Sequence, residues 1–277
     1  MNGKNIFRHL NKPLLLLLVL FVFFGCQPFD KKTRFAPEGM VLIPGVKGHK
    51  IFYMDASPVT VAQFDAFTKK AQYKTDAEKF GNAGVMNMKT GEWSLVPGAN
   101  FRYPQGPDKP SAPSNHPVTQ VSWHDAVAYA HFYGKRLPTR LEWEFAAANG
   151  DPGNQNIYAW GNNWKDADGN FKANFWQGAF PFINTGEDGF LLTSPVGQFG
   201  KNKVGLTDMG GNVWQWTSDW KNPAITDSTG EKIQCGGSFL CDPKVCHGFK
   251  IGNTASATCE TSMFHLGFRC VKDADEQ

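Results

Sequence analysis

Two cysteines near the C-terminal end of the sequence are the clearest candidates for chemistry. Cys241 and Cys246 have four residues between them, and the thiolates that they can form are soft ligands that select Cu(I). Two thiolates leave a coordination position open, so the pair could hold a redox-active metal with room for a substrate. The same short separation permits a structural disulfide, which an oxidising compartment favours. The residues alone leave both interpretations open.

Oxygen donors in the glycine-rich second half are candidate ligands for a hard cation. Asn174 and Asp188 could join backbone carbonyl oxygens around Ca²⁺, and Asp208, Gly211 and Gln215 could frame a second site. Asp-Gly and Asn-Gly pairs also form ordinary turns, so their spacing alone does not separate a calcium site from a turn.

Two histidines, His247 and His265, follow the cysteine pair. Imidazole suits copper and iron and titrates near neutral pH, so either histidine could be a metal ligand or an acid–base group. The alternative for each is an ordinary polar residue.

Three helices are predicted to form the regular part of the chain. Each starts at a capping box, in which a Ser or Thr side chain binds free N–H groups of the first turn. The boxes pair Thr60 with Gln63, Ser122 with Asp125 and Thr139 with Glu142, and the helices extend to about residues 72, 133 and 148. After Gly150 helical periodicity almost vanishes, which predicts an α+β fold with short strands and an irregular second half.

Composition places the protein among globular chains of one or two domains. Of its 277 residues, 41% are hydrophobic and 19% are charged, which is too apolar for intrinsic disorder. There is one long apolar run, so a protein with several membrane spans is excluded. The net charge of +3 is spread along the chain without a basic cluster beyond the leader, which argues against nucleic acid as a partner.

The N-terminus reads as a secretion signal. Residues 1–26 combine a basic start with an apolar run over 14–24, and Gly25 precedes Cys26 in a pattern that resembles a bacterial lipobox. We therefore expect export to the bacterial cell envelope as a lipoprotein anchored at Cys26 and facing the periplasm. An ordinary signal peptide or N-terminal anchor is the alternative. Residues 27–38 are expected to be a tether.

Several motifs together resemble the formylglycine-generating enzyme family, also called sulfatase-modifying factors. They are MVLIPG at 40–45, EKFG at 78–81, GANFR at 98–102, VSWHDA at 121–126, KRLPT at 135–139, ANFWQG at 173–178, GNVWQWTSDW at 211–220, GGSFLC at 236–241 and LGFRC at 266–270. The resemblance implies a single irregular domain over 39–272, related to C-type lectins, with few helices and short antiparallel strands. Residues 273–277 would be a tail.

The resemblance also implies an activity. Cys241 and Cys246 match the family's Cu(I) ligands, Ser238 would help to hold oxygen or substrate, and Trp214 would line the pocket. The implied reaction uses O₂ to convert a peptidyl cysteine of a target protein, such as an exported sulfatase, to formylglycine. Two alternatives are a related metal-dependent oxidase, with copper or iron, in siderophore or metalloenzyme maturation, and a non-catalytic lectin-like module with the two cysteines oxidised.

The family's calcium sites have counterparts here. The resemblance implies a first site formed by the following residues: Asn174, Asp188 and the carbonyls of Phe175 and Phe190. It implies a weaker second site formed by Asp208, Gly211, Val213 and Gln215. Asp208 stands where the family has Asn, and Gln215 replaces a carboxylate.

The segment 247–265 departs from the family pattern. It lacks the usual arginine-rich stretch, and His265 stands at the position of an Asn, which puts the usual Cys-x-Pro-x-Arg substrate in doubt. The family's disulfide partner of Cys270 falls at Ala147, so Cys259 or Cys235 is the expected partner instead.

Overall fold

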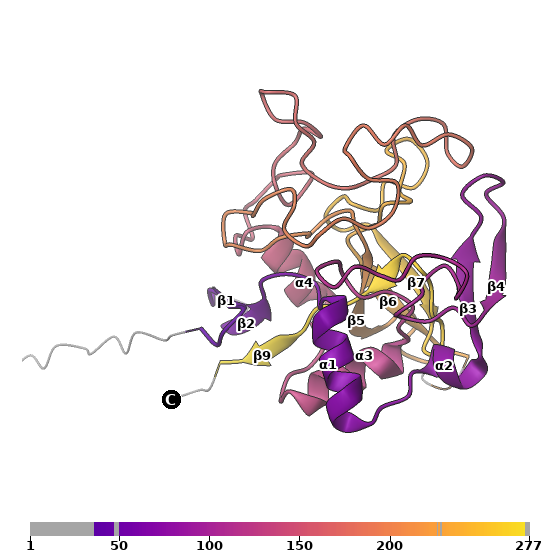
Figure 1. The fold of residues 1–277 in the computed structure, drawn as a ribbon. Helices are drawn as coiled ribbons and strands as arrows, with labels where there is room; N and C mark the ends of the chain where they lie inside the picture. Colours follow the sequence, from indigo (N-terminus) through magenta and orange to yellow (C-terminus); the bar gives the residue numbers. More distant parts are fainter. Residues whose placement is uncertain (1–35, 47–49, 226, 228, 275–277) are drawn as a thin grey trace, which may run out of the picture. The chain divides into compact units, whose positions relative to one another are not determined.

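The computed structural model describes residues 36–46, 50–225, 227 and 229–274 (Figure 1). The predicted signal peptide, most of the tether and Cys26 lie outside these residues, so the lipid anchor stays a prediction. Within the described ranges, no helix is long and apolar enough to cross a membrane.

The described residues form four helices. They are α1 (Val61–Ala71), α2 (Asp76–Phe80), α3 (Trp123–Phe132) and α4 (Arg140–Ala147). The capping boxes predicted at Thr60, Ser122 and Thr139 are present, and all three predicted helices are confirmed. The prediction missed α2, which starts at an equivalent box between Thr75 and Glu78. No helix follows α4 in the described ranges, as the sequence indicated.

Nine short strands form three small sheets in the described residues. The strands are β1 (Met40–Ile43), β2 (Phe52–Asp55), β3 (Asn82–Met86), β4 (Trp93–Pro97), β5 (Trp214–Trp220), β6 (Glu231–Cys235), β7 (Thr254–Thr258), β8 (Leu266–Gly267) and β9 (Val271–Asp273). The sheets have the orders β1-β2-β9, β3-β4 and β7-β6-β5-β8, and every pair is antiparallel except β5 with β8. The expected α+β fold with few helices is confirmed.

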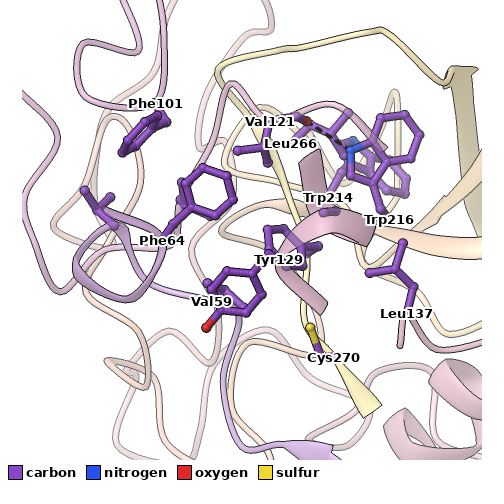
Figure 2. Packing of buried hydrophobic residues seen from close by; sticks show 14 of the residues in the cluster. Val59, Phe64, Phe101, Val121, Tyr129, Leu137, Trp214, Trp216, Leu266 and Cys270 are labelled. Atoms are coloured by element: carbon purple, nitrogen blue, oxygen red, sulfur yellow. Dashed lines mark hydrogen bonds between the residues drawn. The ribbon is translucent and has the colours of Figure 1, made fainter. Parts of the chain in front are cut away.

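Strand β5 contributes two tryptophans to the main core. Its alternate residues Trp214 and Trp216 point into a cluster that includes Phe64 of α1 and Tyr129 of α3 (Figure 2). The buried Trp216 indole still has a polar partner, because its Nε1 donates to the carbonyl of Val121 over 3.1 Å. The packing of these large rings therefore fixes β5 without leaving a buried donor unpaired.

A buried arginine forms hydrogen bonds with three segments that are distant in the sequence. The guanidinium of Arg269 is fully buried and donates to Gln215 Oε1 at 2.7 Å. It also donates to the carbonyls of Asp55, Thr207 and Asp208, at 3.1, 2.6 and 3.2 Å. Burial lowers the pKa of Arg269 to about 10, so the group still carries its charge at neutral pH. Four oxygen acceptors from three separate segments stabilise that charge in place of water.

Two buried carboxylates join the start of α2 to the start of α3. Asp125 accepts hydrogen bonds from the Asp76 backbone N–H at 3.1 Å and from the Tyr73 hydroxyl at 3.0 Å. The Ser122 hydroxyl donates to Asp76 at 2.6 Å. Burial raises the pKa of Asp125 to about 6, against an ordinary value of 3.8.

This raised pKa predicts a pH dependence of stability. Between pH 4 and 6 the folded protein retains a proton on Asp125 that the unfolded chain has released, so raising the pH favours unfolding. From pH 4 to 6 the free energy of unfolding of the wild type should fall by about 1–3 kcal/mol relative to Asp125→Asn. Urea denaturation at several pH values measures it. Parallel pH profiles for the two proteins would show that Asp125 does not titrate in this window.

Candidate functional site

The site centres on the two cysteines that the sequence singled out. Their sulfur atoms lie 2.8 Å apart, and both are thiols. Cys241 is only 2% exposed and belongs to the main core cluster, whereas Cys246 is exposed. The pair therefore has one sulfur fixed by packing and one that faces solvent.

A tight turn between the cysteines brings their sulfurs together. The carbonyl of Asp242 accepts the N–H groups of residues 245, 246 and 247 over 3.0–3.3 Å. Its carboxylate accepts the N–H groups of Lys244 at 2.6 Å and Val245 at 3.1 Å. Sequence reasoning missed the role of Asp242, although an Asp-Pro pair is a turn signal that could have indicated it.

Ser238 and Trp214, two predicted site residues, both lie close to Cys241. The backbone N–H of Ser238 donates to Cys241 Sγ at 3.4 Å, and its hydroxyl accepts from the N–H of Leu240. A Cβ placed on Gly248 would lie 2.5 Å from the Trp214 ring and 2.9 Å from Cys241 Sγ. Glycine at 248 thus allows the indole and the sulfur to pack closely, and sequence reasoning had not identified it. The part of Ser238 in holding oxygen or substrate stays a prediction.

The two thiols differ in acidity. The hydrogen bond from Cys241 lowers the pKa of Cys246 to about 7, from an ordinary value of 9.0. Burial raises the pKa of Cys241 well above the same value. Near neutral pH the pair therefore shares one proton, and Cys246 supplies a thiolate. Such a pair can bind a soft metal ion or form a disulfide.

The two histidines have different surroundings. His247 Nε2 is 3.1 Å from the hydroxyl of Tyr158, which also accepts the indole N–H of Trp164 at 2.7 Å. His265 is buried against Trp93, with ring centroids 5.1 Å apart, and its Nδ1 lacks a hydrogen-bond partner among the described residues. Burial lowers the pKa of His265 to about 3, so this ring is neutral. Metal ligation by either histidine stays a prediction.

The remaining cysteines do not form the expected pairing. Every cysteine in the described ranges is a free thiol, so Cys270 is joined to neither Cys259 nor Cys235. Cys270 packs in the main core, where its N–H donates to the Asp55 carboxylate, while Cys235 packs in a second cluster with Trp143. The physical reason is that the two thiols belong to separate cores.

In the first predicted calcium site, one side-chain oxygen has no hydrogen-bond partner within the described residues. Asn174 Oδ1 is buried and has no hydrogen-bond partner in the described part of the chain. The Asp188 carboxylate accepts from the N–H groups of Phe175 at 3.2 Å and Phe190 at 2.9 Å. Gln177, which sequence reasoning missed, donates from Nε2 to Asp188 and to the Phe175 carbonyl. An unpaired buried oxygen is what a hard cation would satisfy, so Asn174 fits a calcium ligand, whereas the Asp188 carboxylate would share its oxygens between the ion and its present donors.

In the second predicted calcium set the side-chain oxygens already have protein partners. The Asp208 carboxylate accepts from Gly197 N–H at 2.7 Å and from Asn212 Nδ2 at 3.0 Å. Gln215 Oε1 accepts from Trp143 Nε1 at 3.0 Å as well as from Arg269, and its Nε2 donates to the Asp208 carbonyl. The side-chain oxygens here, unlike that of Asn174, are already paired within the protein, and calcium binding at Asp208, Gly211, Val213 and Gln215 stays a prediction.

Two grooves lie beside the residues of the site. One, of 760 Å³, is lined by aromatic side chains, including Trp164 and Trp176, and by the turn residues 242–245. The other, of 780 Å³, runs between the β3–β4 hairpin and residues 258–263, and Trp93 forms part of its wall. Both grooves have volumes typical of sites that bind a ligand or a short peptide segment.

Comparison with known proteins establishes the family. The model of the sulfatase-modifying factor enzyme 1-like domain matches residues 32–274. The formylglycine-generating enzyme of Mus musculus is 40% identical over 89% of this chain and 71% of its own length. That of Mycobacterium tuberculosis is 36% identical over 87% and 93%. The chain therefore belongs to the sulfatase-modifying factor family, as its motifs predicted, and this kinship makes it an enzyme of the oxidoreductase class.

Solved structures agree with the fold. PvdO from Pseudomonas aeruginosa superposes with a TM-score of 0.58 at 21% identity, covering 82% of each chain. CarF gives 0.56 at 22% identity, covering 87% of this chain and 95% of its own. At such identities the likeness concerns the fold alone. A protein named inactive C-alpha-formylglycine-generating enzyme 2, from Mus musculus, is 36% identical over 81% of this chain and 76% of its own length.

The acidity of Cys246 can be tested directly. Its alkylation by iodoacetamide should rise with pH around a midpoint of about 7, because the thiolate is the reactive form. Cys241→Ala should move the midpoint toward 9.0, because it removes the donor that stabilises the Cys246 thiolate. Peptide mass mapping follows the reaction, with buried Cys235 as the internal control. A midpoint that is the same in both proteins would contradict the assigned hydrogen bond.

Proposed function

We propose that this protein is a copper-dependent oxidase that uses O₂ to convert a peptidyl cysteine of a protein substrate to formylglycine. The observation that carries the proposal is the pair of thiols 2.8 Å apart, one packed and one exposed, in a member of the sulfatase-modifying factor family. Two sulfur donors fit Cu(I) better than any hard cation. Cu(I) bound there would supply the one-electron chemistry with O₂ that side chains lack.

The overall reaction balances with a thiol reductant. The substrate cysteine, one O₂ and two thiols yield the aldehyde, hydrogen sulfide, water and one disulfide. Cys246 can give up its proton near neutral pH, and the exposed side of the pair leaves room for the substrate sulfur. Cys241 stays fixed by packing, and the Trp214 ring excludes water from its buried side.

A protein substrate is favoured by the surroundings of the pair. The 760 Å³ groove includes the turn between the two cysteines in its wall, so a peptide held there would pass close to Cys246. We propose that this substrate is an exported protein such as a sulfatase, reached by an enzyme that Cys26 anchors to the envelope. The first calcium set, at Asn174, Phe175, Asp188 and Phe190, would brace residues 174–190, part of which line the same groove.

A related oxidase with a different substrate is the second candidate. It is favoured by His265, which is buried and lacks a partner for Nδ1 at a position where the family motif has an asparagine. A neutral imidazole in place of an amide changes the polar group that lies against Trp93, which lines the 780 Å³ groove. Such a change would alter which peptide the site accepts.

Peptide turnover separates these candidates. Residues 36–277, reduced, loaded with Cu(I) and incubated in air with a thiol and a Cys-x-Pro-x-Arg peptide, should convert the cysteine to an aldehyde that mass spectrometry detects. Cys241→Ser should lower turnover by at least about 100-fold, because a hydroxyl is a poor ligand for Cu(I). Cys259→Ser, which changes a thiol outside the pair, is the matched control. Copper binding without turnover of this peptide would favour the second candidate.

Calcium binding at the first set can be tested through stability. Calcium at about 100 times its Kd should raise the free energy of unfolding by about 2–3 kcal/mol, and chelation should reverse the gain. Asn174→Ala should abolish this response, because it removes the unpaired oxygen. Asn202→Ala removes an amide whose oxygen already accepts the N–H of Leu206 and which does not contact Asn174, so it should keep the response. A calcium response that survives in Asn174→Ala would place the ion elsewhere.

A further inference from the structure

The residue after Cys246 has an unusual backbone. His247 has φ of 49°, in the left-handed region that disfavours residues with a Cβ. This conformation lets the chain leave the Asp242 turn and reach Gly248, where only a glycine fits between Trp214 and Cys241. The position of Cys246 therefore depends on whatever keeps His247 left-handed.

Two contacts of His247, one of its side chain and one of its backbone carbonyl, provide that restraint. Its Nε2 lies 3.1 Å from the Tyr158 hydroxyl, and its carbonyl accepts from Asn253 Nδ2 at 3.0 Å. The indole of Trp164 can only donate, and it donates to the same hydroxyl at 2.7 Å. The Tyr158 hydroxyl thus accepts from Trp164, and it bonds His247 Nε2 either as donor or, through its second lone pair, as acceptor, according to the tautomer of the ring.

Tyr158 is itself held rigidly. It is 3% exposed, and its ring stacks on Trp160 with centroids 5.1 Å apart and planes 12° apart. Phe249, two residues beyond His247, packs against the same ring at 5.5 Å. A fixed hydroxyl at the end of a buried ring is a suitable anchor for an exposed turn.

We propose that Tyr158 is a positioning residue that holds Cys246 in place through His247. Cys241 needs no such anchor, because the core and the Ser238 N–H already fix its sulfur. Cys246 is exposed and is held by backbone contacts on either side of it, the Asp242 turn before it and the Gly248 N–H after it, so the direction of the chain at His247 decides where its sulfur lies. The inference extends the proposed function, since it concerns the less constrained of the two proposed copper ligands.

Tyr158→Phe tests the proposal by removing one oxygen atom. Loss of a group that orients a metal ligand typically weakens binding by at least about tenfold, so Cu(I) affinity should fall by that factor. Competition with a chromophoric Cu(I) chelator measures it. Tyr73→Phe is the matched control, because it also removes a hydrogen-bonded hydroxyl, the one bound to Asp125, and should leave the affinity unchanged. Equal losses in the two variants would mean that the effect is general destabilisation.

A double-mutant cycle tests the pathway through His247. Glycine adopts the left-handed conformation readily, so His247→Gly removes the need for the anchor. Tyr158→Phe should then weaken Cu(I) binding by less than about twofold in the His247→Gly background. A full tenfold loss in that background would overturn the proposal, because Tyr158 would be acting by another route.

A measurement without metal separates this inference from the proposed function. In the metal-free protein, thiols held close together form a disulfide with glutathione more readily than thiols that move apart. The equilibrium constant for oxidation of the pair should fall about tenfold in Tyr158→Phe and stay unchanged in Tyr73→Phe. A wild type that binds no Cu(I) would refute the copper proposal while this equilibrium still tests the anchor. An unchanged equilibrium in Tyr158→Phe would refute the anchor itself.

Discussion

The buried charge of Arg269 is the constraint on which the arrangement of the site depends. A guanidinium withdrawn from water must have its donors satisfied, and here the acceptors come from the end of β2, the loop at 207–208 and β5. Because Gln215 of β5 is one of these acceptors, the contact holds β5 close to the end of β2 and to the loop at 207–208. Once β5 is there, Trp214 lies against Cys241, so the arginine indirectly sets the place of the thiol pair.

The segment between α4 and β5, residues 148–213, depends on individual hydrogen bonds in the same way. It contains no helix or strand, so side chains act one by one as partners for its backbone groups. Asn212, for example, accepts the Ser194 N–H and donates to the Ser194 carbonyl and to Asp208. Loops held in this way can present Tyr158 and Trp164 at fixed positions without helices to carry them. The side-chain oxygen of Asn174, in contrast, is buried without a hydrogen-bond partner in the described residues. It belongs to a predicted calcium ligand.

What the sequence could predict is local. The capping boxes at Thr60, Ser122 and Thr139 predicted three helices because each box lies within four residues. The contact between Cys241 and Cys246 could be predicted because the two residues are close in the sequence. Helix α2 has the same box but is too short to show periodicity. The partners of Cys270 and the contact between Tyr158 and His247, 89 positions apart, depend on how distant segments pack. Such contacts leave no mark in the spacing of one sequence.

The two thiols of the pair differ in burial and in acidity, and this difference suits the pair both to hold a metal ion and to react. A buried sulfur alone would be rigid but inaccessible, and its raised pKa would keep it protonated. An exposed sulfur alone would be reactive but poorly placed. Because Cys241 donates to Cys246, burial of the first creates the acidity of the second, and the two properties arise from one contact. Relatives named formylglycine-generating enzyme and inactive C-alpha-formylglycine-generating enzyme 2 share 40% and 36% identity with this chain, so overall similarity alone does not separate the two kinds of relative.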